Sequence, residues 1–314
     1  MGGWHLVTGG AGFIGSNLVR RLAAGGARVR VFDNLSTGRI ENLAGLENSI
    51  DFVRGDLRAA AAVRAAMRGV AHVFHAGALA SVQASVDDPA TTHEVNVTGT
   101  LNVLLAARAA GVERVVFSSS ASVYGDSPAM PKREDMLPAP LSGYALSKLA
   151  GEHYGRVFHR LYGLNFFALR YFNVFGPRQD PASHYAAVIP LFMRAYAAGR
   201  QPTIYGDGRQ TRDFTFVEDI VAANLCCLSA PASTAGGVYN VAYGDRISIN
   251  DLARQIAALA GQPFAPVYAP PRSGDIRESQ ADSDLARRIL GWQPAHAFAE
   301  GLAATFAWFK ASAG

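Results

Sequence analysis

The sequence predicts an α/β fold in which a doubly wound parallel sheet is followed by a smaller, interleaved C-terminal domain. Short β-rich runs alternate with segments of helical apolar spacing through the first half of the 314-residue chain. That alternation is typical of a parallel sheet covered by helices on both faces. A glycine-rich turn follows the first β-rich run, and prolines interrupt the alternation after Tyr171. A second, less regular domain is therefore expected to begin near that residue.

Six short runs rich in β-branched and aromatic residues are the predicted strands of the sheet. They are Trp4 to Thr8, Arg28 to Phe32, Asp51 to Arg54, His72 to His75, Arg114 to Ser118 and Asn165 to Arg170. The segments with helical spacing between them include Ile14 to Ala24, Ala59 to Met67 and Asn96 to Ala110. Strands and helices in this order predict a doubly wound α/β domain.

The C-terminal half has a different rhythm, which is interrupted at Pro177, Pro181, Pro190 and Pro202. Within it, the segment Asp213 to Tyr243 again has the pattern of a loop, a helix and a strand. We therefore assign residues 1–170 to the first domain and residues 171–314 to the second, with residues 213–244 expected to return to the first.

Composition excludes several classes of protein. An apolar share of 49% with 17% charged residues does not fit a disordered chain or a coiled coil. The formal net charge is +4, but the basic residues form no cationic run, so no nucleic-acid partner is predicted. Cys226 and Cys227 are adjacent in an apolar segment, where they are expected to be small core residues in a reducing, cytoplasmic compartment. No signal peptide, membrane span or metal site is predicted.

The turn after the first predicted strand contains Gly9, Gly12 and Gly15 and leads directly into a helix. Glycines allow a tight turn there and let backbone N–H groups approach a diphosphate at the helix N-terminus. Asp33 closes the second predicted strand, at the distance expected for an acid that binds the adenosine ribose. The pattern predicts a Rossmann domain, and because a carboxylate would repel a 2′-phosphate, the predicted cofactor is NAD rather than NADP.

A second group of polar residues follows the fifth predicted strand. The run Ser118 to Gly125 ends that strand, and Tyr144 and Lys148 follow at the spacing that places both on one face of a helix. A cation beside a phenol favours the phenolate and lowers the pKa of the tyrosine, as does a positively charged nicotinamide ring. This arrangement predicts a tyrosine that takes and returns a proton.

With these motifs the chain resembles the UDP-galactose 4-epimerase family of extended short-chain dehydrogenases along nearly its whole length. The motifs that carry the resemblance are Thr8 to Gly15, Asp33 to Ser36, His75 to Ala78, Asn96 to Thr100, Ser118 to Gly125, Tyr144 with Lys148, Arg170 to Asn173, Thr211 to Phe214 and Arg272 to Asp275. One departure is Gly77, where many relatives carry alanine. The resemblance implies a UDP-sugar substrate, bound NAD and a homodimer formed through helices at Thr91 to Ala110 and Ala145 to Tyr162.

By resemblance, Tyr144 is the general base and acid, Lys148 holds the nicotinamide ribose, and Ser120 hydrogen-bonds the 4-hydroxyl group of the sugar. Asp56 either forms a turn or contacts the adenine amino group. The cofactor contacts that the resemblance implies are Gly9, Gly12, Phe13, Ile14, Gly15, Asp33, Asn34, Ser36, Asp56, Leu57, His75, Ala76, Ala78, Asn96, Tyr144 and Lys148.

The substrate contacts that the resemblance implies are Ser120, Ser122, Tyr144, Asn173, Val188, Arg212, Arg272, Asp275 and Ser279. Arg212 and Arg272 resemble clamps on the diphosphate, which accepts bidentate bonds from arginine. Asp275 either accepts ribose hydroxyls or orients Arg272. Ser122 either contacts the sugar or caps the end of the strand.

The residues after Ser120 distinguish between related reactions. Similar dehydratases carry Asp-Glu there and decarboxylases carry Glu, whereas this chain has Ala121 and Ser122. The resemblance therefore favours reversible hydride transfer through a 4-keto sugar, which inverts C4. A UDP-glucuronate 4-epimerase, another sugar-nucleotide dehydrogenase and a non-catalytic NAD-sensing module are the alternatives.

Two features concern the sugar. The run Arg170 to Pro181 closely resembles bacterial UDP-N-acetylglucosamine 4-epimerases, and an acid at Asp180 would repel a uronate. Ser279 aligns with a bulky tyrosine of strict glucose/galactose epimerases, or it is a solvent-facing loop residue. The sequence leaves the physiological sugar, the pathway and the oligomeric state open.

Overall fold

The computed structural model describes residues 3–180, 187–271 and 277–312. Its main feature is a sheet of seven parallel strands in the order β11-β6-β5-β4-β1-β2-β3. The strands in that order are Val238–Val241, Asn165–Tyr171, Arg114–Ser120, Val70–His75, Trp4–Thr8, Val29–Asp33 and Ile50–Arg54. The predicted doubly wound α/β fold and its six predicted strands are confirmed, with ends shifted by one or two residues.

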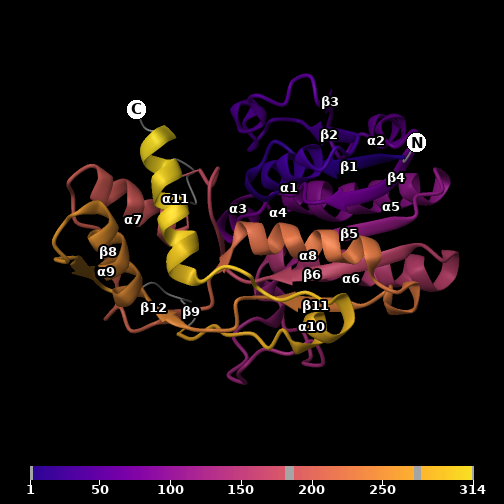
Figure 1. Ribbon diagram of the computed structural model, residues 1–314. Coiled ribbons are helices and arrows are strands. Elements are labelled where there is room, and N and C mark those ends of the chain that lie inside the picture. The colour runs from indigo at the N-terminus through magenta and orange to yellow at the C-terminus, as the bar shows by residue number, and fades with distance from the viewer. Residues whose placement is uncertain (1–2, 181–186, 272–276, 313–314) are drawn as a thin grey trace.

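Helices cover both faces of this sheet (Figure 1). Helices α1 (Phe13–Ala24), α8 (Val217–Ser229) and α10 (Asp284–Leu290) pack on one face, and α2 (Ala60–Ala66), α5 (Gly99–Ala109) and α6 (Gly143–Tyr162) pack on the other. Successive residues of a strand point to opposite faces, so Phe167 packs in the first of these layers and Phe166 in the second. The strands are apolar on both faces, as a parallel sheet between two helical layers requires.

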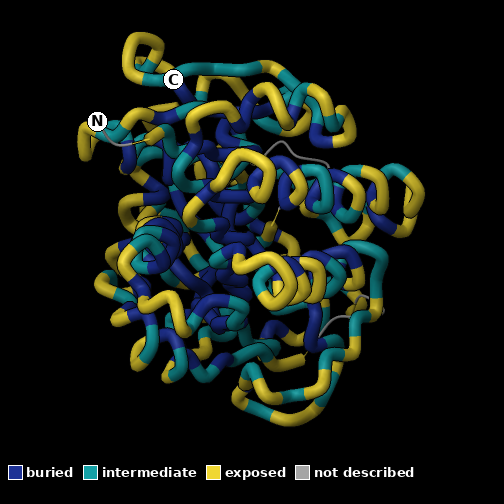
Figure 2. The backbone as a smooth tube through the Cα atoms, turned by 90° about the vertical axis from the view of Figure 1, so that its right-hand side faces the viewer, coloured by how far each residue is buried: buried dark blue, intermediate teal, exposed yellow. Residues whose placement is uncertain are grey.

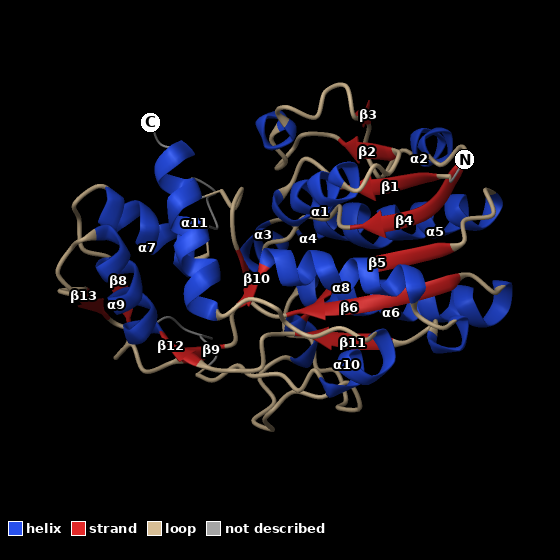
Figure 3. Cartoon of the chain, viewed as in Figure 1, coloured by secondary structure: helices blue, strands red, loops and turns tan. Residues whose placement is uncertain are grey.

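Most of the described chain after Tyr171, apart from α8, β11 and α10, forms a smaller lobe beside the sheet (Figure 3). Its strands pair as β7 (Val174–Phe175) with β10 (Thr215–Phe216), β9 (Thr211–Arg212) with β12 (Ile247–Ser248), and β8 (Thr203–Tyr205) with β13 (Val267–Ala269). Helices α7 (Val188–Ala197), α9 (Ile249–Ala260) and α11 (Phe298–Ser312) enclose an aromatic core. That core contains Phe175, Phe192, Phe214, Phe216 and Phe298.

The chain passes between the two lobes more than once. After the first segment of the smaller lobe, α8 and β11 return to the sheet, and β11 pairs with β6 at its edge. Helix α10 also packs on the sheet, because Leu290 and the neighbouring Trp292 are buried against the α8 layer. We propose the boundary near residue 171 as the division between the domains, with both α8 to β11 and α10 belonging to the first.

The shorter elements lie mostly at the carboxyl ends of the strands. They are α3 (Val82–Asp87), α4 (Pro89–His93), a π-helical turn (Glu94–Thr98) that leads into α5, and three 3₁₀ turns (Ile40–Leu43, Ala121–Tyr124 and Ala232–Thr234). Buried residues are concentrated in the sheet and on the inner sides of the helices (Figure 2). In the described part of the chain, no helix has the length and apolar character needed to cross a bilayer.

Candidate active site

The glycine-rich turn lies at the carboxyl end of β1, where it forms the floor of a cavity of about 680 Å³. Gly9 has φ +68°, and a Cβ on it would lie 2.6 Å from Gly77. A Cβ on Gly15 would lie 2.1 Å from the carbonyl oxygen of Gly9. Only glycine permits this close packing of the turn, which leaves the first residues of α1, Phe13 and Ile14, to line the cavity with Gly12.

Asp33 lies at the end of β2 with 7% of its surface exposed, and it lines the same cavity. Its carboxylate accepts hydrogen bonds from the backbone N–H groups of Ala11 (3.0 Å) and Leu35 (2.8 Å). These bonds join the glycine turn to the loop after β2 and orient a fixed negative charge at the cavity. The geometry suits the binding of ribose hydroxyls and disfavours a 2′-phosphate.

Asn34, Ser36, Asp56 and Leu57 line the cavity beyond Asp33. Asp56 accepts hydrogen bonds from the backbone N–H and the guanidinium of Arg58 and from the amide of Asn34. Those bonds, mainly from Arg58, hold the pKa of Asp56 well below its usual range. Asp56 therefore makes the turn, and its place in the lining is also compatible with a contact to the cofactor.

Four of the expected cofactor residues do not line this cavity: His75, Asn96, Tyr144 and Lys148. The first two lie behind its wall. The ring of His75 is buried between the hydroxyls of Thr8 (2.7 Å) and Thr100 (2.9 Å), and burial together with the charge of Lys148 lowers its pKa to about 3. The amide of Asn96 bonds both backbone groups of Leu79 and the hydroxyl of Ser147. These two side chains hold the loop after β4 in place. Ala76, Gly77 and Ala78 of that loop line the cavity.

Ser120, Tyr144 and Lys148 come together at the carboxyl end of β5. Ser142 caps α6 by accepting the Ala145 N–H, so the helix begins at Gly143 and presents Tyr144 in its first turn. The ammonium group of Lys148 donates to the Ser118 carbonyl (2.8 Å) and lies 5.8 Å from the centre of the Tyr144 ring. The spacing of tyrosine and lysine thus places both groups beside the end of the strand.

The protein alone does not give Tyr144 a low pKa. Burial raises the pKa of its phenol, and a hydrogen bond with Ser120 acts in the opposite direction. Burial also lowers the pKa of Lys148 to about 8, because its ammonium group lies in a nearly water-free environment. A further positive charge near the phenol is needed to make it acidic at neutral pH, and an oxidised nicotinamide ring carries one.

A buried ion pair lies directly behind this cluster. Glu152, one helical turn after Lys148, binds the guanidinium of Arg170 through both carboxylate oxygens (2.7 and 2.8 Å). It also accepts a hydrogen bond of 2.5 Å from Ser119, the neighbour of Ser120. Arg170 packs over the ring of Tyr124 at 4.6 Å. The network joins α6 to β5 and β6 and so fixes the helix that carries the tyrosine and the lysine.

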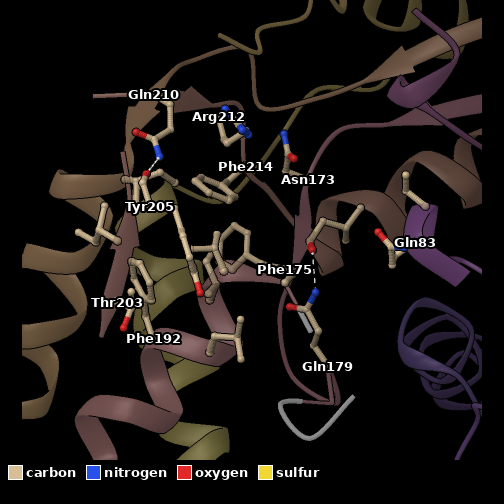
Figure 4. Close-up of a pocket in the computed structure, with 18 residues that line it drawn as sticks. Gln83, Asn173, Phe175, Gln179, Phe192, Thr203, Tyr205, Gln210, Arg212 and Phe214 are labelled. Carbon is tan, nitrogen blue, oxygen red and sulfur yellow. Dashed lines mark hydrogen bonds between the residues drawn. The ribbon is translucent and has the colours of Figure 1, made fainter. Parts of the chain in front are cut away.

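A second cavity, of about 560 Å³, lies between the sheet and the smaller lobe (Figure 4). Asn173, Val188 and Arg212 line it, as the resemblance implies. Asn173 and Arg212 lie at the same end of the cavity near the ring of Phe214, while Gln179 lies at the other end. Gln179 and Ala187 line both cavities, which therefore adjoin each other.

The structure places the other expected substrate residues as follows. The hydroxyl of Ser122 is buried without a partner, while Ser120 accepts the Ser122 N–H (3.2 Å), so the cap of this turn is Ser120. Ser279 accepts a long hydrogen bond from Asn173 (3.5 Å), which places it near a residue of the cavity lining. Arg272 and Asp275 lie outside the described residues.

Asp213 follows Arg212 and ties three segments together around this cavity. Its buried carboxylate accepts hydrogen bonds from the backbone N–H groups of Gly244 and Ala281, and burial raises its pKa to about 7. Its own carbonyl accepts a bond from the amide of Asn173 (2.9 Å). The residue therefore supports the shape of the cavity and does not line it.

Asp180, the acid expected to repel a uronate, lies in the lining of the first cavity and not of the second. It lines the first cavity, with an oxygen 3.6 Å from the guanidinium of Arg39. An ion pair reduces the field of its carboxylate at a distance. Asp180 is therefore weak support for the exclusion of a uronate.

Several lining residues carry no local sequence signal. Phe192, Tyr205, Gln210 and Phe214 come from α7, β8 and the β9–β10 region and meet only in the folded protein. Gln210 donates to the Tyr205 carbonyl (2.7 Å), which fixes one wall of the cavity (Figure 4). Phe214 is the exception, since it is the last residue of the motif Thr211 to Phe214.

Together these features define a class of protein: an NAD-dependent enzyme with a glycine turn and an acidic residue at a dinucleotide cavity. Ser120, Tyr144 and Lys148 form a separate buried cluster, which lines neither of the two cavities. The glycine turn, in which a Cβ on Gly9 or Gly15 would clash with the backbone, and the carboxylate of Asp33 fit an NAD molecule. The model of the NAD dependent epimerase/dehydratase family matches residues 5–242. The chain belongs to this NAD-dependent family.

Individual relatives match over nearly their whole length. A UDP-glucose 4-epimerase from Mycolicibacterium smegmatis is 46% identical, over 97% of this chain and 98% of the relative. A solved UDP-N-acetylglucosamine 4-epimerase from Methanobrevibacter ruminantium, in complex with UDP-N-acetylmuramic acid, is 40% identical with a TM-score of 0.94, over 99% of both chains. A UDP-glucose 4-epimerase from Thermus thermophilus in complex with NAD is 40% identical with a TM-score of 0.88, over 98% of this chain and 99% of the other.

Proposed function

We propose that the protein is an NAD-dependent UDP-hexose 4-epimerase that interconverts UDP-glucose with UDP-galactose and UDP-N-acetylglucosamine with UDP-N-acetylgalactosamine. The observation that carries this proposal is the cluster of Ser120, Tyr144 and Lys148 at the carboxyl end of β5, with no acidic residue directly after Ser120. Epimerase relatives that match along the whole chain support the same assignment.

In this mechanism the phenol oxygen of Tyr144 takes the proton of the sugar 4-hydroxyl group and later returns it. Ser120 holds the oxygen at C4, and Lys148 stabilises the phenolate while its ammonium group stays bound to the Ser118 carbonyl. NAD supplies the hydride acceptor and donor for C4. Because Ala121 and Ser122 carry no carboxyl group, they offer no acid for an elimination, and the 4-keto sugar can only be reduced again.

Binding through the nucleotide suits a reaction in which the sugar must present both faces. Asn173 and Arg212 lie together at one end of the second cavity, where they can hold the diphosphate (Figure 4). The sugar itself then needs few contacts, because an enzyme that bound one orientation tightly would slow the return of hydride to the other face.

The direct test is an epimerisation assay with UDP-glucose, UDP-N-acetylglucosamine and UDP-glucuronate side by side. We expect turnover of the first two. Turnover of UDP-glucuronate alone would replace the proposal with a uronate epimerase. Binding of NAD and UDP without turnover of any of the three would point to a non-catalytic module.

We expect Ser279 to leave room for an acetamido group on the sugar, because its side chain is much smaller than the tyrosine with which it aligns. Ser279→Tyr should suppress turnover of UDP-N-acetylglucosamine and spare UDP-glucose, since a pocket rejects added bulk more readily than missing bulk. The ratio of kcat/KM for the two sugars measures this directly, with UDP-glucose as the internal control. An unchanged ratio would mean that Ser279 does not face the sugar.

We also propose that the protein is a homodimer formed through α6 and its neighbours. Leu146, Val157 and Leu161 of α6 are 58%, 47% and 65% exposed, and Leu105 of α5 is 48% exposed. Val157 and Leu161 lie one turn apart on the same helix face, and a second copy would bury this apolar surface.

Light scattering should therefore give twice the chain mass of 33.3 kDa. Leu161→Glu should shift the protein to monomer, because a carboxylate buried in the proposed interface would lose its hydration without gaining a partner. Leu259→Glu is the matched control, since Leu259 is also exposed (39%) but lies on α9 of the smaller lobe. A monomeric wild-type protein at high concentration would contradict the proposal.

A further inference from the structure

Arg178 follows β7 and lines the first cavity, although no motif assigns it a role. Its backbone has φ +70°, a conformation that is unfavourable for a residue with a side chain. If only the course of the loop mattered, glycine would serve better at this position. We therefore infer that the side chain of Arg178, and not the course of the backbone, explains why an arginine occurs at this position.

The guanidinium group of Arg178 is held at the start of α1. One of its Nη atoms donates to the side chain of Asn17, which in turn donates to the carbonyl groups of Phe13 (2.9 Å) and Pro177 (3.1 Å). These contacts connect the arginine to the first turn of α1, whose Phe13 and Ile14 line the same cavity.

No direct ion pair neutralises the charge of Arg178 within the described residues. Its Nε atom is buried and has no hydrogen-bond partner, and in the described part of the chain no carboxylate lies within ion-pair distance of it. Burial lowers the pKa of Arg178, the positive charge of Arg20 acts in the same direction, and the more distant carboxylate of Glu218 acts in the opposite one. A partly buried cation with an unused donor is costly unless an anion joins it.

We propose that Arg178 binds the diphosphate of NAD. A dinucleotide places its two negative charges at the N-terminus of the helix that follows the glycine turn, which is the end of α1 that Arg178 approaches. A guanidinium group suits this ligand, because two of its N–H groups can bind phosphate oxygens at once. The inference rests on the NAD dependence of the family and not on the identity of the sugar.

The segment that contains Arg178 is attached to two other parts of the chain near the first cavity. Asn17 holds Pro177, and Asp180 forms an ion pair with Arg39 on the far side of the lining. Arg178 lies between these two attachments and lines the same cavity. Removal of the guanidinium group of Arg178 should therefore speed the release of NAD and leave the fold of the protein nearly unchanged.

The test compares Arg178→Gln with Arg200→Gln, which removes an exposed arginine outside both cavities. NAD content is measured on the purified proteins, and the dissociation constants of NAD and UDP are measured by calorimetry at low and high salt. We expect NAD binding to weaken roughly 10- to 100-fold in Arg178→Gln, as for loss of a charge-assisted contact. Its salt dependence should also flatten, while UDP binding and Arg200→Gln stay like wild type.

Equal NAD affinity in the two variants would overturn the proposal. So would a parallel loss of NAD and UDP binding with an unchanged salt dependence, because that would indicate a structural role of the loop. If Arg178→Gln does not fold, Arg178→Lys decides in the same way, with an intermediate loss of NAD affinity expected. No sugar is needed for these measurements, so a failure here is distinct from a failure of the epimerase assay.

Discussion

Replacement of Tyr144 by phenylalanine should lower kcat for UDP-glucose by roughly 10²- to 10⁴-fold, the range typical for loss of a general acid and base. The ring stays in place beside Lys148, so only the hydroxyl group that moves the proton is lost. The affinity for UDP should remain like wild type, because the second cavity is lined by other residues.

Tyr154→Phe is the matched control, since Tyr154 lies on the same helix with 37% of its surface exposed. It should keep wild-type turnover. If Tyr144→Phe also turned over at nearly the wild-type rate, another group would have to move the proton and the mechanism would fail.

Replacement of Glu152 by alanine should reduce the free energy of unfolding by about 3–5 kcal/mol, as when one partner of a buried ion pair is removed. Arg170, whose side chain is only 3% exposed, would keep its charge without a carboxylate beside it. Ser119 would lose its acceptor as well. Denaturant unfolding of the variant and the wild type gives the difference.

The control for that experiment is Asp284→Ala, which breaks the exposed ion pair of Asp284 with Arg287. It should cost no more than about 1 kcal/mol, the usual value for surface pairs. The double variant Glu152→Leu with Arg170→Met should recover much of the loss, because it leaves no buried charge unpaired. Equal effects of Glu152→Ala and Asp284→Ala would show that burial does not determine the cost.

The parts of the molecule that could be predicted are those whose signals lie close together in the chain. The glycine turn, Asp33 at the end of β2, and Tyr144 with Lys148 on one helix face each depend on a few neighbouring residues. Parallel strands then bring their carboxyl ends to one edge, so local motifs become one site without any long-range information.

The parts that escaped prediction depend on contacts between distant segments. From the sequence alone, Glu152 is expected to be an ordinary polar residue of a helix. Its contact with Arg170 of β6 follows only from the fold. Tyr205 and Gln210 are positioned by the pairing of short strands in the smaller lobe. The sequence of that lobe is irregular, so it has little periodicity from which these strands could be predicted. His75 and Asn96 belong to recognisable motifs, yet their side chains support the cavity wall and do not line it.

The late position of β11 has a consequence for synthesis on the ribosome. Strand β6 ends at Tyr171, but its outer neighbour begins only at Val238, so a sheet that forms during synthesis has an unpaired β6 edge until β11 emerges. At roughly 5–20 residues per second, that edge stays open for several seconds. An exposed apolar strand edge can pair with a second nascent chain, so polysomes that translate this message place identical edges near one another during that interval.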